Sequence, residues 1–232
     1  LAIIGVVAAL TIPTLISKYN TMVLNNQFKK VYATLTQALN YAQSEYGRIP
    51  LCYYGENGLA QQTSECTELT DKMLKVLKIS KTCKNNALAN GCIPEYKGYD
   101  DLLKEQHKND ADYDEDYWQN QANVNCGGFN AYTIKTTRRV FVLSDGTIII
   151  EYNNMNNFKF RLIAVDINGK KGPNKWGLDL HAFSTVSNGN YFRYRGDGCM
   201  IPQDNGIYTA NKIIQFFKLS PSSLTVIFAS LP

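Results

Sequence analysis

The sequence has very little of what enzyme active sites commonly use. It contains two histidines, His107 and His181, in 232 residues. It has no phosphate-binding glycine loop, no nucleophile elbow and no zinc-protease motif. A cysteine nucleophile assisted by one of the histidines is the remaining route to a hydrolase. We predict that the chain is not an enzyme, because its even number of cysteines already has a structural use.

Basic charge is not concentrated in any part of the chain. The net charge is +4, from 24 basic and 20 acidic residues. Basic residues occur in pairs, as at Lys29/Lys30, Arg138/Arg139 and Lys170/Lys171. Nucleic-acid-binding domains instead gather such residues on one face. We therefore expect no specific nucleic-acid partner.

The first sixteen residues, Leu1 to Ile16, contain no charge at all. Beyond them, apolar residues recur at steps of three and four, which is the pattern of an apolar stripe on a helix. Gly47 and Pro50 then favour a helix end. The pattern predicts one helix over residues 1–46, about 70 Å long. Such a length indicates anchoring or assembly. The stripe comprises Leu24, Phe28, Val31, Leu35, Ala38, Leu39, Ala42 and Tyr46.

Three residues of the apolar segment favour close packing between helices, and a fourth favours a bend. Gly5, Ala8 and Ala9 are small, and helices that associate in an apolar medium need small residues so that their backbones can approach. Pro13 removes one helical hydrogen bond, which predicts a bend or a melted turn nearby. The alternative is an ordinary membrane anchor in which these residues are incidental.

The segment Leu-Ala-Ile-Ile-Gly-Val-Val-Ala-Ala-Leu-Thr-Ile-Pro-Thr-Leu resembles the mature N-terminal segment of type IV pilins and of the related pseudopilins of type II secretion. Gly5, the pair Ala8 and Ala9, and Pro13 carry the resemblance best. It implies a helix that lies in the bacterial inner membrane before assembly and in the core of a filament afterwards. It also implies a precursor cut by a prepilin peptidase, with the first residues of the mature chain preceding Leu1.

Residues 47–232 are numerous enough to form one domain with its own core. Ser144-Asp145-Gly146 reads as a tight hairpin between two strands, and Leu69 to Leu77 as a short amphipathic helix. We predict an α+β fold in which the helix 1–46 is a spine packed on an antiparallel β-sheet, with long disulfide-tied loops, as the resemblance also implies. The predicted strands are Ala131 to Ile134, Arg139 to Leu143, Thr147 to Tyr152 and Phe158 to Asp166.

The C-terminal stretch 207–232 is more apolar than an exposed tail needs to be. Leu224 to Ala229 could form a closing strand of the sheet. The same stretch could instead be a surface for neighbouring subunits or a poorly ordered end, and the sequence does not choose between these.

Six cysteines lie in the part of the chain that would be exported, and an even number favours disulfides in an oxidising compartment. No two of them have the Cys-x-x-Cys spacing of zinc or redox sites. We predict the short-range pair Cys83–Cys92 first. By proximity and elimination, Cys52–Cys66 and Cys126–Cys199 follow, although sequence cannot select among the pairings.

A polar segment directly after the last predicted strand is a candidate calcium loop. Calcium prefers oxygen ligands, and this segment offers Asp and Asn side chains together with carbonyls at glycine turns. It is similar to an Asp-x-Asn-Gly-x-x-Gly-Pro loop of pilin-like proteins, and some pseudopilins carry calcium in such a region. The same residue types also build turns without any ion, so both interpretations stay open. The candidate residues are Asp166, Asn168, Lys170, Asn174 and Asp179.

A second acidic run, Asp110 to Asp116, begins like an EF-hand loop. The sixth position is Glu115 where a glycine is needed, and the twelfth is Gln121 where a glutamate is needed. We predict a solvated acidic loop there.

Taken together, the sequence predicts a non-enzymatic structural subunit, a pilin or pseudopilin, with an assembly helix at 1–46 and a head at 47–232. Its predicted partners are further pilin subunits in a homo-oligomeric filament, and its predicted place is the inner membrane followed by a cell-surface or periplasmic filament. The alternative from another class is a membrane-anchored exported binding or adhesion protein that does not polymerise. A lone anchor, however, has no need of a close-packing face.

Overall fold

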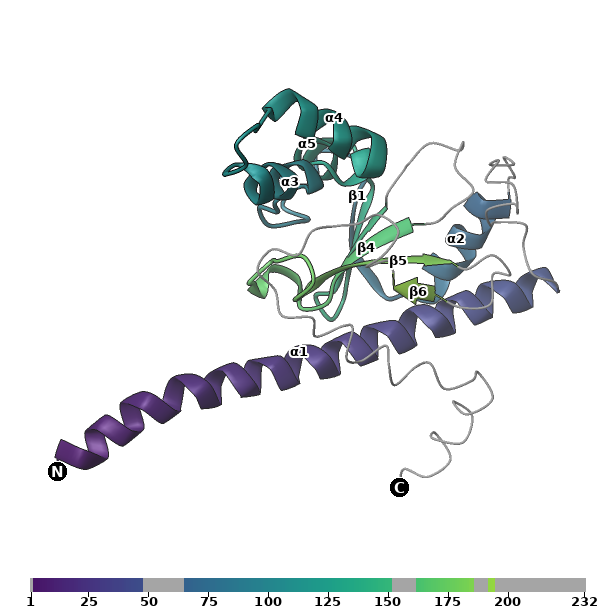
Figure 1. The fold of residues 1–232 in the computed structure, drawn as a ribbon. Helices are drawn as coiled ribbons and strands as arrows, with labels where there is room; N and C mark the ends of the chain where they lie inside the picture. The colour runs from purple at the N-terminus through teal and green to yellow at the C-terminus, as the bar shows by residue number, and fades with distance from the viewer. Residues whose placement is uncertain (1, 48–64, 152–161, 186–191, 195–232) are drawn as a thin grey trace, which may run out of the picture.

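A long N-terminal helix and a sheet dominate the computed structural model, which describes residues 2–47, 65–151, 162–185 and 192–194. The helix α1 (Ala2–Tyr46) runs along the sheet and continues well past it at its N-terminal end (Figure 1). The helices between residues 99 and 136 lie on the other side of the strands (Figure 1). The predicted α+β class, with a long helix on an antiparallel sheet, is confirmed.

Six strands form one antiparallel sheet in the order β1-β2-β3-β4-β5-β6. Each strand therefore pairs with its neighbour in sequence. The strands are β1 (Ile79–Cys83), β2 (Val140–Leu143), β3 (Ile148–Glu151), β4 (Leu162–Asp166), β5 (Leu180–Thr185) and β6 (Phe192–Tyr194). The other helices are α2 (Glu65–Val76), α3 (Tyr99–His107), α4 (Glu115–Cys126) and α5 (Ala131–Thr136), with 3-10 turns η1 (Gly127–Phe129) and η2 (Gly169–Lys171).

The central strands are apolar on both sides, because helices cover both faces of the sheet. Successive side chains of a strand point to opposite faces. One set packs against α1 and α2, and the other packs beneath the segment between β1 and β2, residues 84–139, which we call the helical insertion. The first set includes Phe141, Ile149, Ile163, Val165 and Phe183. The second includes Val140, Ile148, Ile150, Ala164, Leu180 and Ala182.

The predicted stripe on α1 is the side that meets the sheet. Its members from Leu24 to Ala42 are buried, with Phe28 and Leu35 each 1% exposed. Phe28 lies against Phe183, with ring centroids 5.6 Å apart. Burial of this stripe, more than helix propensity, stabilises the second half of the helix.

Local predictions in the head are confirmed at four places. The helix predicted around Leu69 to Leu77 is α2, and the two strands around Ser144-Asp145-Gly146 are β2 and β3. Gly146 has φ +91° and its N–H donates to the carbonyl of Leu143, which closes the hairpin. The disulfide Cys83–Cys92 is present, with Cα atoms 6.3 Å apart.

One predicted strand, Ala131 to Ile134, is wrong, because these residues begin helix α5. The alternating pattern of the segment suits a strand, but Ile134 is the one fully buried side chain there, and it packs beneath the helical insertion. The N–H of Ala131 donates to Asp100 of α3 at 2.8 Å. Tertiary contacts therefore overrode the local preference of the segment.

The strand predicted over Phe158 to Asp166 is confirmed in its described part, β4. Three further sequence predictions fall wholly or partly outside the described residues. The pairs Cys52–Cys66 and Cys126–Cys199 each include a residue there, Cys52 or Cys199, and the stretch 207–232 lies there entirely. They stay predictions.

Candidate cation-binding loop

The predicted calcium segment forms the connection between β4 and β5, which we call the Asp166–Asp179 loop. Asp166 is the last residue of β4, and Asp179 immediately precedes β5. Because these strands are paired in the sheet, the two ends of the loop lie together. Both aspartates have 0% exposure, so two carboxyl groups are buried at one end of the sheet.

Each buried carboxylate accepts hydrogen bonds that hold a turn. Asp166 accepts from the hydroxyl of Tyr96 at 2.7 Å and from the N–H of Asn168 at 3.1 Å. Asp179 accepts from the N–H groups of Asn174 at 2.7 Å and Lys175 at 2.6 Å. Both aspartates therefore build turns. These hydrogen bonds supply no positive charge to balance the two carboxylates.

Burial disfavours the ionised form of both carboxyl groups. It raises the pKa of Asp166 to about 7, with a further contribution from the charge of Asp179, while the Tyr96 hydroxyl opposes the rise. Burial likewise raises the pKa of Asp179, against the backbone N–H groups that bind it. No ion pair within the described ranges includes either aspartate. A buried pair of carboxylates without a cation is costly at neutral pH.

Two asparagine side chains of the loop leave buried oxygens without donors. Asn168 donates from its amide nitrogen to the carbonyl of Gly172 at 2.7 Å. The Oδ1 atoms of Asn168 and Asn174 are enclosed and accept no hydrogen bond from any described residue. Buried acceptors in folded proteins normally have a partner, and leaving one without costs about 1–3 kcal/mol.

The donor set of this loop fits a hard divalent cation. Two carboxylates and two amide oxygens are ligands of the kind that calcium prefers. Among the described residues, no three His, Cys, Asp or Glu side chains are gathered closely enough to hold a metal ion by themselves. A site here therefore depends on the asparagines as much as on the aspartates. Lys170 offers only its backbone, because its ammonium group donates to the carbonyl of Gly91 at 2.5 Å.

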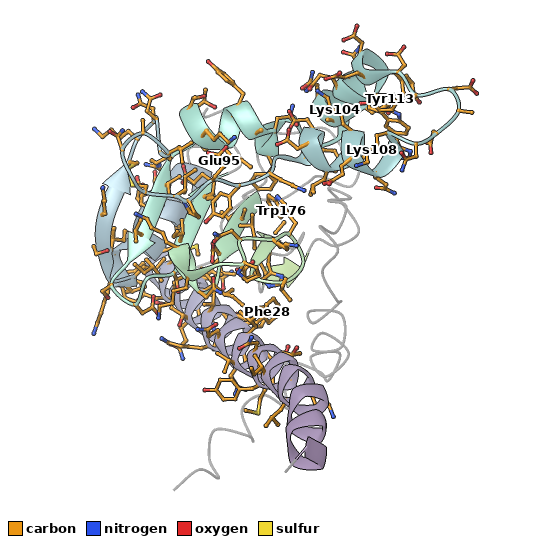
Figure 2. The ribbon with its side chains drawn as sticks, turned by 90° about the vertical axis from the view of Figure 1, so that its left-hand side faces the viewer. Phe28, Glu95, Lys104, Lys108, Tyr113 and Trp176 are labelled. Atoms are coloured by element: carbon orange, nitrogen blue, oxygen red, sulfur yellow. A yellow bond between two sulfur atoms is a disulfide. The ribbon has the colours of Figure 1, made fainter. Side chains whose placement is uncertain are left out.

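The loop is tied to the helical insertion by side chains that the sequence did not single out. Besides the Tyr96 hydroxyl on Asp166, the indole Nε1 of Trp176 donates to the carbonyl of Lys97 at 2.8 Å. Trp176 is 2% exposed and lies between the sheet and the insertion (Figure 2). Its ring also meets Phe129 at 5.5 Å between centroids. Tyr96 is separated from Asp166 by 70 residues, and no local pattern signals that contact.

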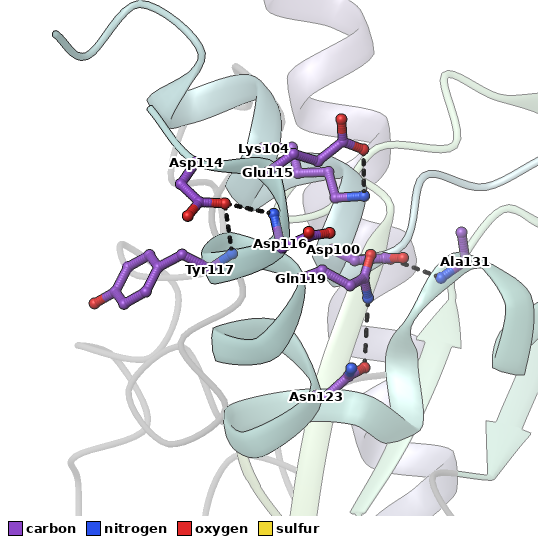
Figure 3. Close-up of polar contacts among 9 residues, drawn as sticks. All are labelled: Asp100, Lys104, Asp114, Glu115, Asp116, Tyr117, Gln119, Asn123 and Ala131. Atoms are coloured by element: carbon purple, nitrogen blue, oxygen red, sulfur yellow. Dashed lines mark hydrogen bonds and ion pairs between the residues drawn. The ribbon is translucent and has the colours of Figure 1, made fainter. Parts of the chain in front are cut away.

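The second acidic run connects α3 to α4 and is exposed, as predicted. Asp114 accepts from the N–H groups of Asp116 at 2.9 Å and Tyr117 at 3.1 Å, and so caps the start of α4 (Figure 3). Glu115 pairs with Lys104 at 3.0 Å (Figure 3). These carboxylates are occupied by a helix cap and a surface pair, in keeping with a solvated loop.

The two histidines have packing roles. His107 stacks on Trp118 with centroids 3.5 Å apart and contacts Asp110 at 2.8 Å. His181 is 1% exposed and meets Phe28 edge to face at 4.8 Å. Burial lowers the pKa of His181 to about 4, so its ring is neutral near pH 7.

The predicted assembly residues Gly5, Ala8, Ala9 and Pro13 lie in α1, which continues as a helix through Pro13. The melted turn expected near this proline is therefore not formed. On the next turns, α1 leaves large apolar side chains uncovered. Within the described ranges, no helix combines the length and hydropathy required to cross a membrane. The uncovered side chains are Leu15 (68% exposed), Ile16 (53%), Tyr19 (60%) and Met22 (54%).

Comparisons of the chain with protein-family models, with curated proteins and with solved structures found no match.

Proposed function

We propose that this chain is a structural subunit of a bacterial type IV pilus or type II secretion filament, and that it polymerises through α1. The observation that carries the proposal is the contrast along one helix. From Leu24 to Ala42 its stripe is buried against the head, whereas Leu15, Tyr19 and Met22 are more than half exposed. These three residues are spaced by four and three, so they share one side of the helix.

A second copy of the chain is the partner that best suits this surface. Contiguous exposed apolar side chains mark an interaction site. The preceding residues Gly5, Ala8 and Ala9 are small enough to let two helix backbones approach. A stage in the inner membrane before assembly belongs to the same proposal. The competing function, an anchored binding protein, would leave the small residues without a use.

Electron microscopy of sheared surface fractions tests the assembly proposal. Cells would make the full-length precursor, either unchanged or with Gly5→Leu and Ala9→Leu. We expect filaments from the unchanged protein and none from the double variant. Asn40→Leu is the matched control, because Asn40 is exposed on the half of α1 that packs on the head, and it should leave filaments intact. Membrane-bound monomers in all three strains would favour the anchored binder.

We also propose that the Asp166–Asp179 loop binds a divalent cation, with calcium the best match to its oxygen donors. The specific support is the pair of enclosed Oδ1 atoms on Asn168 and Asn174 beside two buried carboxylates that form no ion pair with any described residue. A bound cation would supply the missing positive charge and a partner for those oxygens.

Thermal unfolding with calcium and with a chelator tests the cation proposal. A ligand bound only by the folded state stabilises it, by about 2.7 kcal/mol at a hundred times its dissociation constant. We expect the rise in melting temperature to disappear in Asp179→Asn and to persist in Asp112→Asn, which changes the exposed acidic run. An unshifted melt of the unchanged protein would contradict the site.

A further inference from the structure

We propose that the Asp166–Asp179 loop is a cation-controlled latch that holds the helical insertion on the sheet. The inference rests on the cation site proposed above and adds what the site regulates. Its basis is the set of contacts that cross from this loop to residues 91–98, the stretch that enters α3.

Three hydrogen bonds make the crossing, and each uses a different residue of the loop. Asp166 accepts from the Tyr96 hydroxyl at 2.7 Å. Trp176 donates to the carbonyl of Lys97 at 2.8 Å. The third bond runs from the Lys170 ammonium group to the carbonyl of Gly91 at 2.5 Å. The start, middle and later part of the loop therefore all bind the stretch 91–98.

The stretch that the loop holds is locked in turn to two helices of the insertion. Gly98 precedes α3, and its N–H donates to Asp101 at 2.9 Å. Asp100 accepts from the N–H of Ala131 at 2.8 Å, which joins α3 to the start of α5 (Figure 3). A Cβ placed on Gly98 would lie 1.9 Å from the nitrogen of Ala131, so the two backbones are in direct contact. A displacement of residues 96–98 must therefore move both helices.

The state of the loop decides how firmly this chain of contacts is held. Without a cation, two buried carboxylates repel each other at the point where Tyr96 binds, and two amide oxygens have no partner among the described residues. A cation held by the Asp and Asn oxygens removes both penalties while Asp166 keeps its bond to Tyr96. The disulfide Cys83–Cys92 restrains only the entry to the insertion. At the other strands, Lys81 of β1 donates to the carbonyl of Asn90, and Arg139 pairs with Glu151 of β3. The contacts from the Asp166–Asp179 loop are the ones that reach residues 96–98, next to α3.

Amide hydrogen exchange, measured separately for each helix of the full-length chain, tests the latch. We expect saturating calcium, compared with chelator, to slow exchange in α3 and α5 by about tenfold. Exchange in the part of α1 after Leu24 should not change, because α1 packs on the opposite face of the sheet. Asp112→Asn is the control with its acidic change outside the loop, and it should respond to calcium as the unchanged protein does.

Variants that cut the crossing contacts separate the latch from the site. Tyr96→Phe removes the hydroxyl on Asp166, and Lys170→Met removes the exposed lysine that reaches Gly91. With calcium bound, as measured by calorimetry on the same samples, either variant should lose part of the calcium-dependent slowing in α3 and α5. Lys170→Met keeps the test available if Tyr96→Phe fails to fold.

The outcomes distinguish the two proposals. Calcium binding with unchanged exchange in α3 and α5 would overturn the latch and leave the cation site standing. Absence of calcium binding in the unchanged protein would overturn both. Calcium-dependent slowing of amide exchange that is undiminished in both Tyr96→Phe and Lys170→Met would also overturn the latch, because the effect would not depend on the crossing hydrogen bonds.

Tryptophan fluorescence gives a second measurement on the loop itself. In a Trp118→Phe background, Trp176 is the single tryptophan, and its fluorescence should respond to calcium. Fluorescence that stays unchanged while calcium binds would count against the latch.

Discussion

The two faces of the sheet are covered in different ways. The face toward α1 is joined by a large cluster of apolar side chains, and the buried His181 packs there against Phe28. The face toward the helical insertion has an apolar layer as well, but at its edge Tyr96, Asp166 and Asp179 form a buried polar cluster. The stability of the α1 face therefore depends on the apolar area buried, whereas the stability of the insertion face also depends on charge.

This difference assigns the two faces different tasks. An apolar interface of a long helix depends little on ions, because it is held by buried apolar area, and it joins α1 firmly to the sheet. A buried polar cluster is strongly stabilising when its charges are balanced and destabilising when they are not. In the filament that we propose, the α1 face would carry load between α1 and the head. In the latch that we propose, the insertion face would respond to a bound cation.

The largest expected effect comes from breaking the α1 face. Phe28→Ala removes a side chain that is 1% exposed and that contacts both Phe183 and His181. We expect a loss of about 3–5 kcal/mol in the free energy of unfolding, measured by denaturant titration. Tyr19→Ala is the control on the uncovered part of the same helix and should change stability by no more than about 0.5 kcal/mol. Equal losses would contradict the division of α1.

Acid should weaken the same face through His181. Burial lowers its pKa to about 4, whereas an unfolded histidine titrates near 6.5, so the unfolded chain takes up the proton first. Its contribution is complete above pH 6.5 and is lost as the pH falls towards 4, by about 3 kcal/mol. Asp166, with its pKa raised to about 7, acts in the opposite direction over a similar range.

The test of that acid effect is therefore a difference between proteins. His181→Leu should gain stability relative to the unchanged protein as the pH falls from about 6.5 to 4. Unfolding free energies at matched pH values in the two proteins give this difference directly. Parallel pH profiles would show that His181 takes no part.

On the insertion face, Gly169→Ala should distort the Asp166–Asp179 loop. Gly169 has φ +64°, and a Cβ there would lie 2.1 Å from the carbonyl oxygen of Gly146. We expect a loss of about 2 kcal/mol in stability together with weaker calcium binding. Gly47→Ala separates the two causes, because Gly47 has φ +66° with nothing within 4 Å of its Cβ. A loss no larger than that of Gly47→Ala would contradict a steric role for the contact.

The smallest effect is expected where α1 meets the β2–β3 hairpin. Lys30 pairs with Asp145 at 2.8 Å, but their side chains are 64% and 39% exposed. Such surface pairs contribute about 0–1 kcal/mol and weaken with salt. Lys30→Met should therefore change the unfolding free energy by less than about 1 kcal/mol, and by still less at high salt. A larger loss would mean that the α1 face also depends on charge.

Local pattern in the sequence was enough to predict the elements whose partners lie nearby or repeat along a helix. The stripe of α1, the hairpin at Ser144 to Gly146 and the disulfide Cys83–Cys92 all follow from spacing within a few turns. The same reasoning found the polar residues of the β4–β5 connection, because Asp, Asn and Gly at short intervals mark either a turn or an oxygen site.

What the chain pattern could not reveal are contacts that join distant segments. Ala131 to Ile134 alternates like a strand but forms a helix, because Asp100 binds its first N–H and Ile134 is buried under the insertion. Tyr96 and Trp176 join the loop to the insertion across 70 and 79 residues. The periodicity of apolar residues predicts which side of a helix or strand is buried. Which distant segment packs against that side is set by the packing of the whole domain.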